Sequence, residues 1–285
     1  MSTKKQTTQR KKTQTSNRPG SAPRRRQSKK ARKKQQQLYL LLGLGIGLCA
    51  CLLIFSIYKL SSIFLGYQSG SKEYTELQQY VTAEAPLPDE TPADGEDSEA
   101  RTSRIDLASL KEVNSEAVGW VEIPDTEISY PMAHTSDNSY YLTHTFSNEK
   151  NKAGSIFIET ANKSDFSDLH TIIYGHNMKN GSMFAGLKNF SKKDYWESHP
   201  YVYIDLEDGS HCYEIFSCHV APVTDITYTI GFAPDDTYAS FLEEITASSE
   251  YDTGVEVGTD DYVVSLSTCT NGGKDRFVVH AKKLY

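Results

Sequence analysis

Three polar side chains stand at the ends of apolar, β-rich runs of this sequence. Cys269 ends one run and opens into a Gly-rich stretch, and His176 ends another run. Arg276 follows the cysteine by seven residues, where the next run begins. A group at the end of a strand, beside a loop, is held rigidly and can still be reached by a substrate. The positions therefore suit residues that do chemistry.

The three residue types together indicate nucleophilic catalysis. A thiol can exchange protons with an imidazole, and the two groups need only meet in space. An arginine is always charged and offers forked donors that suit an oxyanion. Taken singly, each residue also has a structural interpretation. Cys269 could be a small buried hydrophobe, His176 a histidine of a surface loop, and Arg276 an exposed arginine at a strand edge.

The chain that must position these residues is mainly β. From residue 119 on, short runs rich in β-branched and aromatic residues alternate with turn residues. Strands are expected at 120–123, 127–131, 155–159, 169–174, 201–206, 212–220, 262–269 and 276–284. Helices are expected near 107–118, 183–190 and 237–247. About eight strands with few helices predict a closed β-barrel with peripheral helices, because closure leaves no exposed edge.

The motifs around the three polar residues resemble those of the sortase family. The family signatures are a Tyr-Gly-His strand end, a Leu-x-Thr-Cys strand end and an arginine on the last strand. They occur here as Tyr174–His176, Leu266–Cys269 and Arg276. The resemblance covers roughly residues 105–285 and implies the eight-stranded sortase-type barrel. The class B sortases are the most similar class, on the stretches 119–124, 128–132, 137–142 and 154–158 and on the helix between the Cys212 and Cys269 strands.

The resemblance implies a cysteine transpeptidase that cleaves a sorting motif in secreted proteins. The thiolate of Cys269 would attack a threonine carbonyl and form a thioacyl-enzyme, which an amine of the cell-wall peptidoglycan precursor would resolve. His176 would protonate the leaving amine and Arg276 would hold the oxyanion. No cofactor is implied. The substrate contacts of class B carry over to Asn138, Leu142, Tyr228, Ile230 and Ser267.

Two further functions stay open at this point. A pilin polymerase would use a lysine side chain as the acceptor amine, and an anchored binding domain would keep the fold without catalysis. The intact cysteine, histidine and arginine argue against the second of these. One departure from the family pattern is Asp275, directly before Arg276, which could orient the arginine, compete for it or be a bystander; a bystander role is favoured.

Charge is distributed unevenly along the 285 residues. Residues 1–37 hold 14 of the 30 Lys and Arg and no acidic residue, whereas the rest of the chain carries all 37 Asp and Glu. So polar a segment cannot form a core, and a disordered tail is predicted for it. Residues 38–58 are 21 residues without a charge, long enough to cross a membrane as a helix. Such a division indicates two environments for the two parts of the chain.

The predicted organisation follows from this division. A transmembrane anchor at 38–60 follows the tail, then an acidic linker at 61–104 and the catalytic domain at 105–285. Basic residues stay on the cytoplasmic side, so the N-terminus is expected to be cytoplasmic and the catalytic domain extracellular. Because an anchor follows the basic tail, a membrane is the expected partner of this part of the chain and nucleic acid is not.

Four of the five cysteines lie away from the predicted site. Five irregularly spaced cysteines do not make a disulfide framework. An H-C-x5-C-H pattern at 211–219 holds metal-type ligands. On a regular strand, however, Cys212 and Cys218 would share one face and the two histidines the other. No metal site is therefore predicted, nor a disulfide between the two cysteines, because six strand residues span roughly 20 Å.

Overall fold

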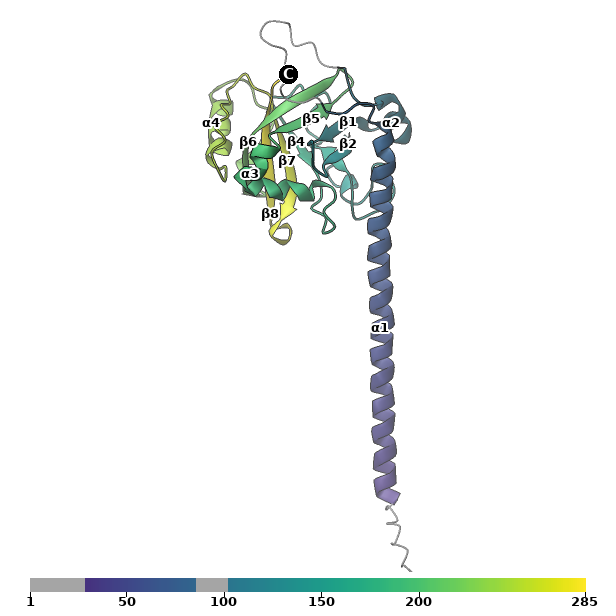
Figure 1. The fold of residues 1–285 in the computed structure, drawn as a ribbon. Coiled ribbons are helices and arrows are strands. Elements are labelled where there is room, and N and C mark those ends of the chain that lie inside the picture. The colour runs from purple at the N-terminus through teal and green to yellow at the C-terminus, as the bar shows by residue number, and fades with distance from the viewer. Residues whose placement is uncertain (1–28, 86–101) are drawn as a thin grey trace, which may run out of the picture. The chain divides into compact units, whose positions relative to one another are not determined.

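The computed structural model describes residues 29–85 and 102–285. Two compact units divide the chain, Met1–Tyr58 and Lys59–Tyr285. In the second unit, eight strands close into a barrel in the order β1-β2-β3-β4-β7-β8-β6-β5 (Figure 1). The pairs β2–β3 and β4–β7 are parallel, and the others are antiparallel. The predicted closed eight-stranded barrel is confirmed.

Each of the eight strands overlaps one of the predicted runs. The strands are β1 Ala117–Glu122, β2 Ser129–Ala133, β3 Ile156–Ile158, β4 His170–Tyr174, β5 Tyr201–Asp205, β6 Ser210–Pro222, β7 Val263–Thr270 and β8 Asp275–Lys283. All of them contribute buried apolar side chains to one core, among them Trp120, Ile204 and Leu266. Burying such a side chain stabilises the fold by about 1.5–3 kcal/mol. The apolar pattern of the runs therefore sets which face of each strand points inward.

Short helices cover the barrel. They are α2 Leu107–Val113, α3 Lys193–Ser198 and α4 Asp236–Ala247, with the 3₁₀ segments η1 Gln78–Tyr80, η3 Tyr140–Leu142, η4 Phe184–Ser191, η5 Ile226–Tyr228 and η6 Asn271–Gly273. The N-terminus of α4 is capped by Asp235, whose carboxylate accepts hydrogen bonds from the amides of Thr237 and Tyr238. The apolar face of α4 packs on Phe216 and Val263, which belong to β6 and β7.

Two helix predictions differ from the structure, and one helix was not predicted. The helix expected at 107–118 ends at Val113, because β1 begins at Ala117 and the chain must become extended there. The segment expected as a helix at 183–190 is the 3₁₀ segment η4. The helix α3 was not predicted, since its 6 residues are too few to show a helical period.

A β-bulge corrects the expected placement of the two barrel cysteines. The register of β6 against β8 shifts between Ile215 and Ser217. Tyr213 and Ile215 point into the barrel core before the shift, and Cys218 does so after it. The extra residue of a bulge reverses the alternation of faces. Cys212 and Cys218 therefore lie on opposite faces, and the prediction that they share one is wrong. Both are buried, and neither forms a disulfide.

The N-terminal helix is longer than the apolar run. Helix α1 spans Lys29–Leu77. Among the described residues, the segment 29–80 contains the one helix long and apolar enough to cross a membrane, by length and composition. Residues 29–37, predicted to be disordered, are helical because Lys, Arg, Gln and Ala favour helices and extending an existing helix needs no new nucleus. The remainder of the predicted tail, 1–28, lies outside the described residues.

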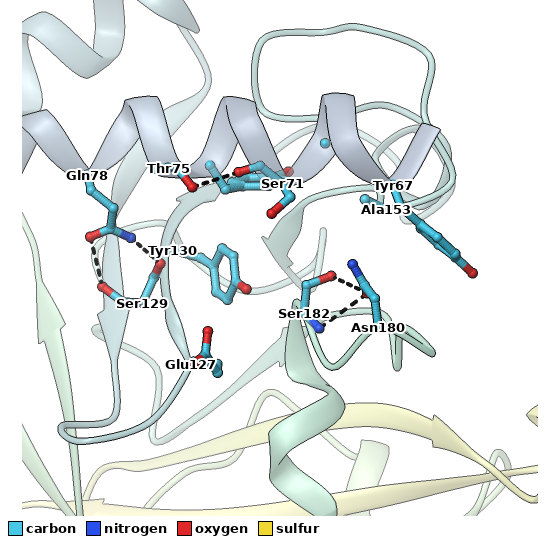
Figure 2. A pocket seen from close by; sticks show the side chains of 12 residues that line it. Tyr67, Ser71, Thr75, Gln78, Glu127, Ser129, Tyr130, Ala153, Asn180 and Ser182 are labelled. Atoms are coloured by element: carbon cyan, nitrogen blue, oxygen red, sulfur yellow. Dashed lines mark hydrogen bonds between the residues drawn. The ribbon is translucent and has the colours of Figure 1, made fainter. Parts of the chain in front are cut away.

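The end of α1 belongs to the folded catalytic domain and not to a linker. Tyr74 and Leu77 are buried in the main core. The Tyr74 hydroxyl donates a hydrogen bond of 2.5 Å to the carbonyl of Gly154. Gln78 Nε2 donates one of 2.8 Å to the carbonyl of Ser129, and Figure 2 shows Tyr130 beneath the same stretch of helix. The beginning of the predicted linker 61–104 is thus helical and docked.

The chain beyond this helix returns to pair with the start of the predicted domain. Val81 forms a bridge with Ile105, and the amide of Thr82 donates to the carbonyl of Arg104. The catalytic domain therefore includes the helix and begins well before residue 105. The sequence pattern hid this, because the apolar face made by Tyr67, Tyr74 and Leu77 lies among many polar residues. Residues 86–101 of the predicted linker lie outside the described residues.

We expect Tyr74→Ala to destabilise the catalytic domain. The substitution removes a ring that is 5% exposed and packs edge-on against Tyr130 at 5.3 Å between ring centroids. Removal of a buried aromatic side chain costs about 3 kcal/mol or more. Urea unfolding of the full chain in detergent, followed by tryptophan fluorescence, would measure the loss. Thr75→Ala, on the exposed side of the same turn, is the control; equal stability of Tyr74→Ala and the parent would show that the helix does not belong to the domain.

Candidate active site

The ends of β4 and β7 bring His176 to the level of Cys269. The two strands run parallel, with Tyr174 paired to Ser267. Beyond this pair, the amide of Gly175 donates to the carbonyl of Ser267 at 3.1 Å. Asn177 Nδ2 then donates to the carbonyl of Cys269 at 2.6 Å. Beyond the pair Tyr174–Ser267, the two segments continue in the same direction by two residues each. His176 and Cys269 therefore lie side by side at the same end of the barrel.

Arg276 lies on the other side of Cys269. The hairpin of β7 and β8 pairs these two residues directly, and cross-strand partners in an antiparallel pair point to the same face. Arg276 Nη1 donates to the carbonyls of Gly273 at 3.0 Å and Asp275 at 3.1 Å. The guanidinium is thereby fixed on the turn beside the thiol. The bond to Asp275 is to its backbone carbonyl, and the role of the Asp275 carboxylate stays a prediction.

His176 is held by two neighbours. Its Nε2 lies 2.8 Å from the carbonyl oxygen of Leu142, and since a carbonyl only accepts, Nε2 carries the proton in this arrangement. The ring packs on Gly154, which has φ +61°; a Cβ added there would lie 2.8 Å from Cδ2 of His176. The glycine is therefore required both by the left-handed backbone and by the close approach of the imidazole.

Tyr228 forms a wall beside the cysteine. Its hydroxyl lies 3.0 Å from Ser267 Oγ, and its ring stacks on Tyr174 with 6.5 Å between centroids. Burial raises the pKa of Tyr228 to about 12, with smaller influences from Ser267, Arg276 and Cys269 among others. The hydroxyl is therefore protonated at neutral pH and acts as a neutral hydrogen-bonding group close to Cys269 and Arg276.

A carboxylate that the sequence did not single out joins two parts of the site. Glu159 accepts a hydrogen bond of 2.7 Å from Asn138 Nδ2 and one of 2.9 Å from the Tyr174 hydroxyl. Asn138 Oδ1 also accepts from the amide of Thr160 at 2.9 Å. Burial first, and then Glu159, raise the pKa of Tyr174 above its usual value. The side-chain amide of Asn138 thus has structural partners on both of its atoms.

The predicted substrate-contacting residues differ in their surroundings. Leu142 is 42% exposed and its carbonyl holds His176. Ser267 is buried under Tyr228, and Ile230 is half-buried just after it. Tyr174 and Glu159 were missed as site residues. The Tyr-Gly-His motif placed Tyr174 close to His176 in the sequence, but only the structure shows that Glu159 contacts Tyr174.

An open cleft of about 220 Å³ lies elsewhere on the domain, between the end of α1 and the barrel (Figure 2). Its lining includes Ser71, Glu127 and Asn180 and none of His176, Cys269 and Arg276. The three predicted catalytic residues therefore lie at the strand ends of β4, β7 and β8 and do not line this cleft.

Comparisons with known proteins agree with this geometry. The profile of the sortase domain family matches residues 121–284. Sortase B of Listeria monocytogenes is 39% identical over 183 residues, which are 63% of this chain and 74% of that protein. The structure resembles sortase B from Bacillus anthracis, with a TM-score of 0.65, 34% identity and coverage of 78% of this chain and 99% of that one.

A complex of Staphylococcus aureus sortase B with a substrate is also similar, with a TM-score of 0.67, 27% identity and coverage of 77% of this chain and 98% of that one. The fold, the family profile and the relatives agree on one assignment. This chain belongs to the sortase family of cysteine transpeptidases, and its relatives are class B sortases.

Proposed function

We propose that this protein cleaves a sorting motif in secreted proteins and joins them to an amine of the cell-wall peptidoglycan precursor. The observation that carries the proposal is the meeting of His176, Cys269 and Arg276 on the neighbouring strand ends of β4, β7 and β8. A thiol with a proton-carrying imidazole on one side and a forked cation on the other is the minimal machinery for acyl transfer.

In the first half-reaction, the Cys269 thiolate attacks the carbonyl carbon of the threonine in the motif. The oxyanion that develops is held by Nε and Nη2 of Arg276, since Nη1 is bonded to the turn. The peptide C–N bond then breaks, and His176 gives its proton to the leaving amine. The products are a thioacyl-enzyme and the freed C-terminal fragment of the substrate.

In the second half-reaction, the acceptor amine attacks the thioester carbonyl. A new amide forms, the carbon–sulfur bond breaks and the Cys269 thiolate is restored. The imidazole of His176, now without its extra proton, takes one from the attacking amine. Each group is therefore returned to its starting state, as turnover requires. The reaction needs no cofactor.

The walls of the site suit an extended peptide. The Tyr228 hydroxyl meets Ser267, two residues before Cys269, and Ile230 follows two residues after Tyr228. The Leu142 carbonyl lies 2.8 Å from His176 Nε2, and Asn138 precedes Leu142 by four residues. We propose these five residues as the sorting-motif contacts. The Asn138 amide is bonded to Glu159 and Thr160, so it would contact a peptide by exchanging or sharing those bonds.

A direct test is to incubate the full chain in detergent with a library of candidate pentapeptides and to weigh the intact protein. A mass increase equal to the acyl fragment, reversed by hydroxylamine, is expected for the peptides that fit. Acceptor choice is then read with two added amines, a peptidoglycan stem peptide and a lysine-containing pilin-like peptide. Transfer to the lysine peptide alone would favour pilin polymerisation, and the absence of any adduct across the library would contradict the proposal.

The proposed topology places the N-terminus in the cytoplasm and the catalytic domain outside, anchored by residues 38–60. The support is that residues 1–37 contain 14 basic residues and no acidic one, and that they precede the one long apolar helix found in the part of the chain that the structure describes. Protease added to intact protoplasts is expected to remove the domain and to spare an N-terminal tag. A control digest of permeabilised protoplasts should remove both. Loss of the tag with survival of the domain would reverse the orientation.

A further inference from the structure

Three histidines and a serine form a buried chain of contacts outside the three strand ends of the proposed active site. His170 Nε2 lies 2.7 Å from Ser265 Oγ, and Ser265 Oγ lies 2.7 Å from His280 Nδ1. The His280 ring stacks on His219, with centroids 5.1 Å apart. Exposed fractions of 0% for His170, Ser265 and His280 and 5% for His219 show that water does not reach these groups freely. We call these four residues the histidine cluster.

The two ends of the histidine cluster hold the segment that carries Tyr228. His170 Nδ1 lies 2.7 Å from the carbonyl oxygen of Thr229. His219 Nε2 lies 3.1 Å from Thr227 Oγ1. The two attachment points flank Tyr228 in the sequence. The backbone on both sides of this tyrosine is therefore held from within the domain, while its hydroxyl meets Ser267 near Cys269.

The donors and acceptors in the histidine cluster can be assigned from hydrogen-bond chemistry. The Thr229 carbonyl only accepts, so His170 Nδ1 must carry a hydrogen. Burial lowers the pKa of His170 to about 4, which leaves the ring neutral at pH 7 and Nε2 without a proton. Ser265 must then donate to His170 Nε2, and its oxygen accepts from His280 Nδ1. All three donors point toward Thr229.

The other end follows the same logic. Thr227 Oγ1 donates to the Asp225 carboxylate at 2.7 Å, so it accepts from His219 Nε2. His219 Nδ1 and His280 Nε2 are then the unprotonated nitrogens of their rings, and both are buried without a hydrogen-bond partner. Burial lowers the pKa of both rings, so both stay neutral. The cluster thus has one consistent proton arrangement.

We propose that His170 is a positioning residue for sorting-motif recognition, because its Nδ1–H fixes the Thr229 carbonyl and with it the orientation of Tyr228 and Ile230. The inference rests on the proposed function, in which these two side chains contact the motif. An apolar residue at position 170 would leave the carbonyl without this donor, and the segment would move to find another partner. His170 acts through the segment and does not touch the reacting atoms.

The test compares two replacements of His170 in the full chain in detergent. His170→Leu removes the donor, whereas His170→Asn places an amide N–H near the position of Nδ1. We expect His170→Leu to raise KM about tenfold for the pentapeptide that acylates the parent best, with kcat within about twofold. His170→Asn should restore KM to within about threefold of the parent. His211→Asn, a buried histidine bonded instead to Asp208, is the matched control and should leave KM unchanged.

Amide hydrogen exchange gives a second readout that does not need turnover. Faster exchange is expected in the peptide covering 226–231 for His170→Leu, and parent-like exchange for His170→Asn. If His170→Leu does not fold, Ser265→Ala takes its place and should raise KM about threefold by removing the donor to His170 Nε2. Unchanged KM and exchange in the folded variant, or equal impairment by Leu and Asn, would overturn the proposal. If the parent forms no adduct, the proposed function fails, and exchange alone decides the positioning role.

Discussion

Replacement of Cys269 by alanine is expected to abolish both the thioester and the turnover, while peptide binding is retained. Cys269 lies near the end of β7 and is partly exposed. The end of β4, which leads to His176, is on one side of it, and its cross-strand partner Arg276 is on the other. Alanine removes the sulfur and leaves the strand and the walls of the site in place. Intact-protein mass spectrometry should show no adduct, and fluorescence titration with a labelled pentapeptide should give a dissociation constant close to that of the parent.

The other cysteines of the folded domain provide matched controls. Cys212 and Cys218 are 3% and 0% exposed, so a peptide carbonyl cannot reach either sulfur. Burial raises the pKa of Cys218 to about 11, and a raised thiol pKa means less thiolate at neutral pH. Cys212→Ala and Cys218→Ala should therefore keep turnover, with at most some loss of stability. Cys49 and Cys51 lie within the apolar stretch of α1.

The companion variant His176→Ala tests the role of the proton donor while leaving the nucleophile in place. It should bind the peptide and lose most turnover, because the leaving amine then lacks a proton donor. A contribution of roughly 100-fold or more is usual for a positioned acid. An adduct that persists in Cys269→Ala, or turnover by that variant equal to the parent, would show that the nucleophile lies elsewhere and would overturn the assignment of the whole site.

The sequence was sufficient for the barrel and for the three polar strand ends. Strands that bury one face leave a period-two pattern, and Cys269 and His176 stood out because no such pattern requires a polar residue where a strand ends. The sequence indicated only that antiparallel or adjacent strands could bring Arg276 beside Cys269, and the direct pairing of the two is a finding of the structure. Pair registers between strands distant in the chain, such as β4 and β7, could not be derived from local pattern.

Other features depended on long-range packing. The bulge in β6 has no local signal, because Ile215 and Phe216 are both apolar and nothing in their types marks an extra residue, so the face of Cys218 was assigned wrongly. The docking of the helix on the barrel was missed because Tyr74 acquires its role only against Gly154 and Tyr130. Glu159 was invisible for the same reason: its partners Asn138 and Tyr174 come from other segments.

The histidine cluster illustrates the limit most clearly. His170 lay within a predicted strand, and a polar residue in such a run gives no sign of what it meets. Its partners are Ser265 of β7, 95 residues distant along the chain, and Thr229 in the segment after η5, while Ser265 in turn meets His280 of β8. Only a closed barrel brings these elements together. Buried polar groups of this kind are satisfied by tertiary structure, and their hydrogen bonds are the part of the fold that sequence patterns describe least.

Substitution of Arg276 by lysine is expected to lower kcat about 100-fold while the fold is kept. Removing one donor of an oxyanion site costs about 100-fold or more. In this structure, Nη1 of Arg276 is bonded to two carbonyls of its own turn, and the proposed oxyanion donors are the other two nitrogens. A lysine has a single ammonium group, which cannot be anchored on the turn and present a planar pair of donors to the oxyanion at the same time.

The measurement must separate charge from geometry. Arg276→Lys keeps the charge, so a large loss of kcat would assign the effect to the forked donors, and an unchanged melting temperature would exclude unfolding. Lys274→Ala, which removes an exposed charge from the same turn, should leave kcat within a few-fold of the parent. Asp275→Asn tests the bystander role of that carboxylate, for which kcat within a few-fold of the parent is expected. Activity of Arg276→Lys within a few-fold of the parent would mean that another group stabilises the oxyanion, and the backbone amides of the turn between β7 and β8 would be the next donors to examine.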